Sequence, residues 1–356
     1  ELALTSNTTA GFFEGWFDEF SSGKLGCDGP VEYPYEWRPA GYGSNINLLS
    51  LAWVNARAKG NSDIAVIVHK DNLFARTTCE EASNGVETRG GWPCIFAEMP
   101  HLCAFDTEED WAIYNWQHGL LQTKHVSASR RKTVAGIRME MKATYPILEP
   151  GTDIMDVLAK LYEYMHSYLQ PWFKADVQAI LDEPDIAAVR EGKFVGMHIR
   201  RTDKLKYDGS KLTPTETYFQ NTVHYLARAP GGLVAADITG LWLSTDEDAV
   251  FDEVRALAPK YFPNISPEGV VFVTGRVPVR PMLKGTFDEG ASDRNTYEAM
   301  VLLRLELQML AEADVFSGTF SSNLGRIVYL MRHTLNKPKE SALSAEVPSW
   351  HPGRHR

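Results

Sequence analysis

The chain has 356 residues, a mass of 39.9 kDa and a formal net charge of −10 at pH 7. This length exceeds what one hydrophobic core usually fills, so we expect two domains. A sequence pI of about 5.5 argues against a broad cationic surface for nucleic acid or anionic membranes, because phosphate affinity needs Lys and Arg clustered over a wide face. No stretch of the sequence reaches the ~20 consecutive apolar residues of a membrane span. Any anion site must therefore be local.

The first third of the chain is rich in aromatic residues and turns. A glycine turn at "GYG" opens an apolar run that ends at Gly60, and "DIAVIVH" then predicts a buried strand, an order typical of α/β folds. The cysteines also lie in this third, at Cys27, Cys79, Cys94 and Cys103. An even number in one domain favours disulfides formed in an oxidising compartment, and buried free thiols are the alternative.

Two further features favour the secretory pathway. The tripeptides that begin at Asn7 and Asn264 fit the N-glycosylation pattern. The chain begins at Glu1 rather than Met, which is compatible with the removal of a signal, transit or membrane-anchor segment.

The middle and the end of the chain show a second α/β series. From Gly151 apolar residues recur at helical spacing, and a second helix is expected near Pro171. Beyond Glu191 amphipathic helices alternate with the short strands "KFVGMHIR", "GLWLSTD", "GVVFVTG" and "VFSG", which predicts a parallel, doubly wound sheet. We therefore predict an N-terminal α/β domain at 1–190, a Rossmann-type domain at 191–340 and a C-terminal tail at 341–356.

Polar clusters follow three of these strands, where ligands of open parallel sheets bind. In "HIRRTDK", alternation sends His198 and Arg200 to one face of the sheet and Arg201 to the other. The other two clusters are "LWLSTDED" and "FSGTFSSNLGR", each at the start of a helix. Guanidinium forks match phosphate, and helix N-termini bind anions, so together the three clusters indicate a nucleoside diphosphate site.

Each cluster also has a simpler interpretation. The arginine pair is compatible with a structural salt bridge to Asp203 or Asp246. Hydroxyls near a helix start are the ordinary N-caps, and "STDED" fits either a solvated helix start or a metal-binding Asp-x-Asp motif.

The motif "HIRRTDK" resembles the first motif of the α1,6-fucosyltransferase family, which includes core N-glycan and rhizobial chitin-oligosaccharide enzymes. Every position of the family pattern, His, apolar, Arg-Arg-Thr-Asp-Lys, is met. The second and third family motifs resemble "LWLSTDED" and "AEADVFSGTFSSNLGRIVYLMR", and weaker similarities lie at "GYGSNINLL" and "LQPWF". The resemblance spans roughly 41–332.

The resemblance implies a GT-B-like fold, with two Rossmann-type domains and a cleft between them. It implies an inverting fucosyltransferase that uses GDP-β-L-fucose, needs neither metal nor cofactor, and forms an α1,6 linkage to GlcNAc of an N-glycan core or a chitin-like oligosaccharide. The expected partners are GDP-fucose and a glycan or glycoprotein acceptor, and the expected location is the Golgi lumen.

The resemblance also implies roles for individual residues. Arg200 would hold the β-phosphate and be indispensable, while His198 and Glu306, where the family has Asp, would hold the guanine. Other donor-site residues would be Arg201, Asp203, Lys204, Asp246, Glu247, Thr319, Ser321 and Ser322, with Gly43 and Asn45 from the glycine loop. Lys204 is also counted among the catalytic residues.

The catalytic base is the point at which the sequence departs from the family pattern. In the core N-glycan enzymes a glutamate in the loop after the first motif is the proposed base, whereas this loop reads "LKYDGSKLTPTETY". Asp208 is the nearest equivalent and Glu216 the second candidate. Tyr218 either lines the pocket or belongs to the core.

Acceptor choice stays open at this level. The tryptophans of the first domain, Trp92, Trp111 and Trp116, fit either sugar stacking or the core. The alternatives are a protein O-fucosyltransferase or another glycan fucosyltransferase, and, as a different class, a non-catalytic module that binds a GDP-sugar.

Overall fold

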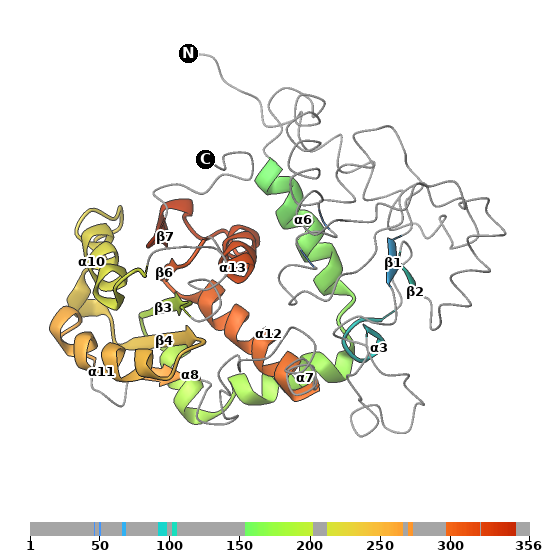
Figure 1. Cartoon of the computed structure of the whole chain (residues 1–356), viewed down its shortest axis with the longest axis horizontal. Coiled ribbons are helices and arrows are strands. Elements are labelled where there is room, and N and C mark those ends of the chain that lie inside the picture. Colours follow the sequence, from blue (N-terminus) through green and yellow to red (C-terminus); the bar gives the residue numbers. More distant parts are fainter. Residues whose placement is uncertain are drawn as a thin grey trace, which may run out of the picture. The chain divides into compact units, whose positions relative to one another are not determined.

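A computed structural model describes ten segments of the chain (Figure 1): 46, 50, 66–68, 92–97, 102–104, 154–201, 212–265, 270–272, 297–320 and 322–346. These residues belong to two compact units, which divide between Leu169 and Gln170. The domain boundaries predicted at residues 190 and 340 stay a prediction. None of the helices in the described ranges is long and apolar enough to span a membrane.

The described part of the first unit includes a short parallel pair of strands and the two helices named below. Strand β1 (Val66–Val68), predicted within "DIAVIVH", pairs in parallel with β2 (Leu102–Ala104), and α3 (Trp92–Ile95) lies between them in sequence. The helix predicted after Gly151 is α6 (Ile154–Ser167), and the residue that follows it, Tyr168, accepts a 2.7 Å hydrogen bond from the amide of Ala97. Cys94 in α3 is buried and disulfide-bonded.

The second unit begins with two helices that each start at a proline. Helix α7 (Pro171–Leu181) and helix α8 (Pro184–Glu191) have the proline in their first turn, where its missing N–H costs no hydrogen bond. Helix α7 packs against helix α12 (Tyr297–Glu312), and the Tyr297 hydroxyl donates a 2.6 Å hydrogen bond to Asp176. Helix α8 packs on the sheet.

The centre of this unit is a five-stranded sheet in which all neighbouring strands are parallel. Its strands are β3 (Phe194–Ile199), β4 (Gly240–Thr245), β5 (Val270–Phe272), β6 (Val315–Gly318) and β7 (Ala342–Ser344). Their order across the sheet is β5-β4-β3-β6-β7. From β3 the chain adds β4 and β5 on one side, and it then adds β6 and β7 on the other side of β3, so the order of strands reverses between β3 and β6. This is the order of a doubly wound Rossmann-type sheet, so the prediction for this part of the chain is confirmed.

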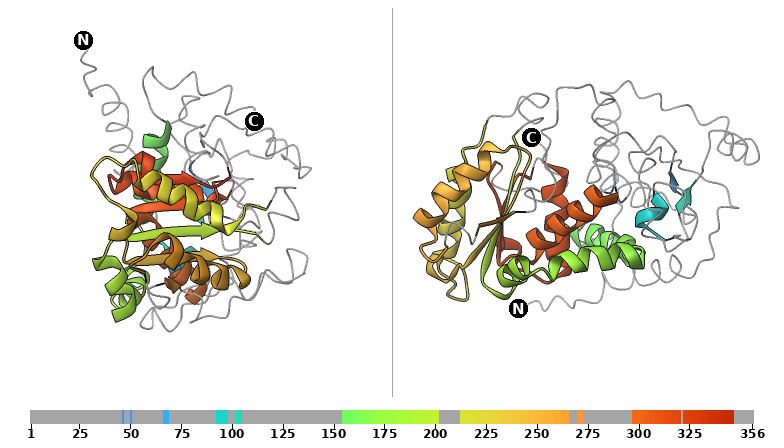
Figure 2. Two further views of the ribbon diagram at one scale, coloured as in Figure 1. Left: turned by 90° about the vertical axis from the view of Figure 1, so that its left-hand side faces the viewer. Right: turned by 90° about the horizontal axis from the view of Figure 1, so that it is seen from below.

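Helices cover both faces of the sheet (Figure 2). Helix α10 (Thr215–Leu226) and helix α11 (Ala249–Tyr261) lie on one face, over a core that includes Val195, Met197 and Ile199 of β3. Helices α12 and α13 (Asn323–Thr334) lie on the other face. On that face a Cβ at Gly196 would lie 3.1 Å from the Ala313 side chain, so glycine permits the close approach of helix and strand.

Two short 3-10 helices and one strand complete the unit. The 3-10 helix η4 (Ala235–Asp237) precedes β4, and η7 (Lys339–Ser341) precedes β7. The edge strand β7 was not predicted, and it lies in the segment expected to be a tail. Its three residues are too few to show an alternating pattern, and its pairing with β6 supplies the backbone hydrogen bonds that define it.

A buried arginine joins the elements at the edge of the sheet where its strands begin. Arg332 of α13 is 2% exposed, and its Nη1 donates to the carbonyl oxygens of Ala311 (3.1 Å) and Ala313 (2.6 Å). Its Nη2 donates to the Asp314 carbonyl (3.2 Å) and to the Ser341 hydroxyl (2.5 Å). The guanidinium thus satisfies carbonyl groups at the end of α12, the start of β6 and η7. Burial lowers its pKa to about 10, so it remains charged at neutral pH.

We predict that Arg332→Met lowers the free energy of unfolding by about 3 kcal/mol, because several buried carbonyl groups lose their donor. Urea-induced unfolding followed by circular dichroism measures the change. The matched control is Arg255→Met, since Arg255 is half-exposed and its Nη1 forms a long ion pair, 3.9 Å, with Oδ1 of the exposed Asp252. The control should change stability by less than about 0.5 kcal/mol. Equal effects of the two substitutions would contradict a structural role for Arg332.

Candidate functional site

The candidate site lies where the strand order of the second unit reverses. Strand β3 is the neighbour of both β4 and β6, so its carboxyl end lies between theirs. The residues that follow these strands therefore meet there: Arg200 and Arg201 after β3, Asp246 after β4, and Thr319 after β6. Open parallel sheets bind their ligands at this switch point. The topology thus brings together the described members of all three polar clusters.

A buried hydroxyl pair joins β3 and β6 at this edge. The hydroxyl of Tyr218 on α10 and that of Thr319 are 2.9 Å apart, and Thr319 donates to the His198 carbonyl at 3.2 Å. Tyr218 is 1% exposed and Thr319 is 0% exposed. Burial raises the pKa of Tyr218 to about 12, so the phenol stays neutral at physiological pH. These two side chains fix the strand ends beneath the site. Of the two interpretations of Tyr218, pocket lining or core, its burial agrees with the core.

Arg200 faces the N-terminus of α13. Its Nη1 donates a 3.1 Å hydrogen bond to the hydroxyl of Ser322, and its Nε lies 3.8 Å from Oδ2 of Asp246. Ser322 is the N-cap residue of α13, but its side chain makes no capping hydrogen bond. The first-turn N–H groups of α13 have no intrahelical acceptors, as in any α-helix. A guanidinium and a helix N-terminus are therefore adjacent, which is a favourable arrangement for an anion.

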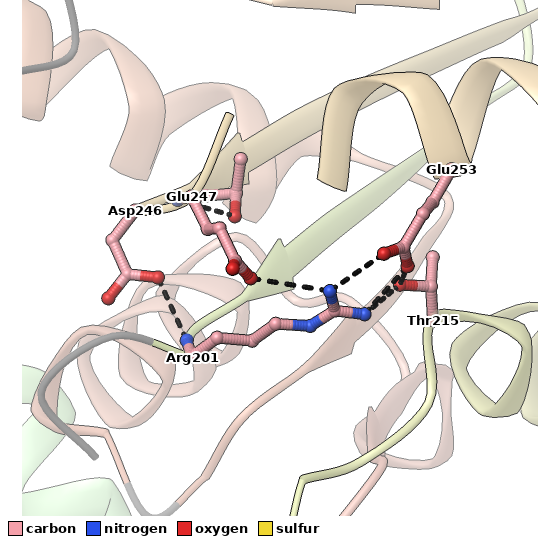
Figure 3. A network of polar contacts seen from close by, with 6 residues as sticks. Arg201, Thr215, Asp246, Glu247 and Glu253 are labelled. Carbon is pink, nitrogen blue, oxygen red and sulfur yellow. Dashed lines mark hydrogen bonds and ion pairs between the residues drawn. The ribbon is translucent and has the colours of Figure 1, made fainter. Parts of the chain in front are cut away.

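Arg201 points to the opposite face of the sheet and is bound by carboxylates (Figure 3). Its two Nη atoms donate to the two oxygens of Glu253, at 2.9 and 2.7 Å, and Nη1 also donates to Glu247 at 3.3 Å. Thr215 accepts from Nη2 at 2.5 Å. The hydrogen bond to Glu253 raises the pKa of Arg201, and the same bond lowers the pKa of Glu253. Of the two arginines, Arg201 therefore forms the structural salt bridge that was the simpler interpretation of the motif. Its side-chain partners are Glu253 and Glu247.

Asp246 connects the two arginines. Its Oδ1 accepts a 2.8 Å hydrogen bond from the backbone N–H of Arg201, and its Oδ2 is the oxygen that faces Arg200. Glu247, the next residue, holds the Arg201 side chain instead. In the ranges that the structure describes, no group of three or more His, Cys, Asp or Glu residues is arranged to hold a metal ion.

Two titratable groups, the buried His198 and the partly buried Glu306, lie on the α12 face of the sheet. His198 is the register partner of Ser244, whose hydroxyl donates a 3.0 Å hydrogen bond to Oε2 of Glu306. Burial and, to a lesser extent, the nearby Arg200 cation lower the pKa of His198 to about 4, so the imidazole is neutral at pH 7. Among the described residues its Nδ1 has no hydrogen-bond partner. Burial raises the pKa of Glu306 to about 7, and the Ser244 hydroxyl opposes this shift.

These groups suit the edge of a heterocyclic base. A neutral imidazole offers one donor and one acceptor, and an ionised carboxylate accepts two N–H bonds. Glu306 has one oxygen, Oε1, that does not take the Ser244 bond. A base bound here could form hydrogen bonds with Nδ1 of His198 and Oε1 of Glu306, and this would offset the cost of removing these groups from water.

The second candidate base, Glu216, is engaged on the surface between α10 and α11. Its Oε1 accepts 2.5 Å hydrogen bonds from Lys260 and from the Tyr261 hydroxyl. The Lys260 bond is the main cause of its lowered pKa, which makes Glu216 a weaker proton acceptor. The first candidate, Asp208, lies outside the described residues, as do Gly43, Asn45, Asp203, Lys204 and Ser321.

Three residues of the site were not predicted: Thr215, Ser244 and Glu253. Ser244 stands inside the motif "LWLSTDED" but was given no role of its own, although its position at a strand end was a usable signal. Glu253 stands inside a helix among other charged residues and looks like part of a solvated face. Its pairing with Arg201, 52 residues away, becomes visible only in three dimensions.

Comparisons with known proteins give weak similarities. No protein-family profile matches the chain. A structure of NodZ α1,6-fucosyltransferase soaked with GDP-fucose is 13% identical with a TM-score of 0.46, covering 84% of this chain and 91% of that one. A structure of the same enzyme co-crystallised with GDP is 14% identical with the same TM-score and coverages. The R284K mutant of Arabidopsis thaliana FUT1 with GDP is 10% identical with a TM-score of 0.44, covering 89% and 73%. At these values the similarities assign no function to the chain.

The raised pKa of Glu306 predicts a pH-dependent stability. A carboxyl whose pKa rises from 4.5 to about 7 on folding binds more protons in the folded state between these values, so its contribution to stability falls as pH rises from 4.5 to 7. Glu306→Gln removes this dependence. The variant should gain about 3 kcal/mol relative to the unsubstituted protein between pH 4.5 and pH 8.

Urea unfolding at pH 4.5, 6 and 8 measures this difference. Glu298→Gln is the matched control, because Glu298 lies on the same helix but is exposed. Parallel pH curves for Glu306→Gln and the unsubstituted protein would contradict a buried, neutral carboxyl.

Proposed function

We propose that this chain is an inverting glycosyltransferase that transfers L-fucose from GDP-β-L-fucose. The observation that carries the proposal is the placement of Arg200. This residue belongs to a motif, "HIRRTDK", that matches the family pattern at each position, and its guanidinium lies at the switch point of a Rossmann-type sheet beside the N-terminus of α13.

The donor is proposed to lie along the carboxyl edge of the sheet. Arg200 and the first turn of α13 would bind the diphosphate, with Ser322 and the adjacent Ser321 at its side. His198 and Glu306 would bind the guanine on the α12 face. The contact between Arg200 and Ser322, at 3.1 Å, supports this arrangement because it orients the guanidinium toward the helix N-terminus.

The charges of the site fit the departure of GDP. The acceptor oxygen attacks carbon 1 of fucose while the bond from that carbon to the β-phosphate oxygen breaks, and inversion gives the α-fucoside. Negative charge grows on the leaving diphosphate. The Arg200 cation and the α13 N-terminus stabilise this charge from fixed positions, a task that a metal ion performs in other transferases. We therefore propose a mechanism that needs no metal.

A base must take the proton from the acceptor hydroxyl. We propose Asp208 for this role, with Lys204 and Asp203 beside the donor. The engagement of Glu216 with Lys260 and Tyr261 supports the choice, since a carboxylate with a lowered pKa accepts a proton less readily.

The acceptor is proposed to be a GlcNAc hydroxyl of an N-glycan core or a chitin-like oligosaccharide, joined in α1,6 linkage in the Golgi lumen. This part of the proposal rests on the motif resemblance. Turnover of GDP-fucose against a panel of N-glycan, chitin-oligosaccharide and protein acceptors separates it from protein O-fucosylation. Binding of GDP-fucose without GDP release in the presence of any of these acceptors would favour a module that only binds the GDP-sugar.

We predict that Arg200→Ala lowers kcat for fucose transfer by roughly 10³-fold or more, because the fixed charge that stabilises the leaving phosphate is lost. Arg200→Lys keeps one charge but loses the fork, and it should still lose roughly 10²-fold. The control is Arg190→Ala, at the opposite edge of the sheet, where Arg190 pairs with Glu312 at 2.8 Å. Substantial turnover by a folded Arg200→Ala variant would overturn the proposal.

We predict that EDTA leaves transfer unchanged, since the proposed cationic groups are part of the protein. Initial rates with excess EDTA, and then with added Mn²⁺ or Mg²⁺, measure this. A loss of activity that Mn²⁺ or Mg²⁺ restores would favour the metal-binding interpretation of Asp246 and Asp248.

A further inference from the structure

The side chain of Glu253 joins three structural elements (Figure 3). Glu253 lies on α11, and its two oxygens accept hydrogen bonds from Arg201, at the end of β3. Oε2 also accepts a 2.5 Å hydrogen bond from Thr215, the first residue of α10. We call Glu253, Arg201 and Thr215 the Glu253 clamp. The clamp ties the end of β3 to the starts of two helices on the same face of the sheet.

We propose that Glu253 is a positioning residue for Arg200, and that it acts through Arg201. The inference rests on the proposed function, because the orientation of Arg200 matters to the extent that Arg200 binds the donor diphosphate. The two arginines are adjacent on a strand end, so their side chains leave the backbone on opposite faces. A clamp that fixes Arg201 on the α10–α11 face therefore keeps Arg200 directed to the other side, where Ser322 and the α13 N-terminus lie.

The backbone provides the physical connection. The amide of Arg201 donates a 2.8 Å hydrogen bond to Oδ1 of Asp246, and Oδ2 of the same carboxylate faces Nε of Arg200 at 3.8 Å. Asp246 can hold both groups only while the peptide before Arg201 keeps its orientation. The Arg201 side chain, 10% exposed and bound at both Nη atoms, fixes that peptide from the other side.

The clamp also gives the two arginines different electrostatic partners. Arg201 is paired with the carboxylates of Glu253 and Glu247, so its charge is compensated within the protein. On the other face, Nη1 of Arg200 donates to the Ser322 hydroxyl, and its Nε lies 3.8 Å from Oδ2 of Asp246. The geometry therefore makes Arg201 the anchor, and the proposed function assigns the ligand to Arg200.

The test compares Glu253→Gln with a matched substitution. The glutamine keeps the shape but cannot accept both Nη bonds as a charged fork, and a misplaced guanidinium should lower kcat by roughly 10- to 100-fold. The control is Glu312→Gln. Arg190 donates to the two oxygens of Glu312 at 2.8 and 3.2 Å, a similar fork in the same unit, but at the edge where the strands begin. The control should change kcat by less than about 3-fold.

A double-mutant cycle shows whether Glu253 acts through Arg200. GDP affinity is measured by calorimetry for Glu253→Gln, Arg200→Ala and the double variant. Glu253→Gln alone should weaken binding by roughly 10-fold, whereas in the Arg200→Ala background it should have no further effect. Equal losses in both backgrounds would overturn the proposal. Should Glu253→Gln fail to fold, Thr215→Val removes only the Thr215 bonds, and it should give a smaller loss with the same dependence on Arg200.

A measurement without ligand separates this proposal from the proposed function. Amide hydrogen exchange of Arg201, followed by NMR, reports the bond to Asp246. Glu253→Gln should accelerate this exchange, and Glu312→Gln should leave it unchanged. Unchanged exchange in Glu253→Gln would overturn the positioning role. If the unsubstituted protein neither binds GDP nor turns over GDP-fucose, the proposed function fails, and the exchange of this amide still decides whether Glu253 fixes the strand end.

Discussion

Two adjacent guanidinium groups at the end of a buried strand impose the constraint on which this site depends. Neither cation can leave water without a partner, and strand geometry sends the two side chains to opposite faces. The chain meets this constraint differently on the two faces. Arg201 is bound by acidic side chains of α11 and its preceding loop, while the contacts of Arg200 include a serine hydroxyl at a helix N-terminus and a carboxylate oxygen of Asp246. The Arg201 pairing therefore anchors the strand end on one face, and Arg200 is directed to the helix N-terminus on the other.

The reversal of strand order makes this asymmetry useful. Because β3 has β4 on one side and β6 on the other, the residue after β3 can contact groups from both neighbours. Asp246 approaches from β4 and Ser322 from the turn after β6. The buried pair of Tyr218 and Thr319 keeps β3 and β6 in register below these contacts. The site is thus supported by the rigid part of the fold rather than by long loops alone.

Periodicity predicted the strands β3 to β6 and the helices α7 and α10 to α13 of the second unit, because most of these elements are long enough to show their pattern and to bury an apolar face. The strand ends then gave the positions of Arg200, Asp246 and Ser322. The same reasoning could not separate the roles of Arg200 and Arg201, since both read as phosphate ligands. The distinction depends on Glu253, whose carboxylate is remote in sequence and adjacent in space. The strand β7 was missed because its three residues owe their conformation to pairing with β6.

The buried carboxyl of Glu306 has a consequence for how a ligand would be detected. Its pKa of about 7 leaves it partly protonated in neutral solution. A ligand that binds only the ionised form must expel the remaining proton into the solvent. The heat of binding would then include the ionisation enthalpy of the buffer that takes up this proton, and it would differ between phosphate and Tris at the same pH. The affinity of the site for a base would therefore depend on the pH of the surrounding solution.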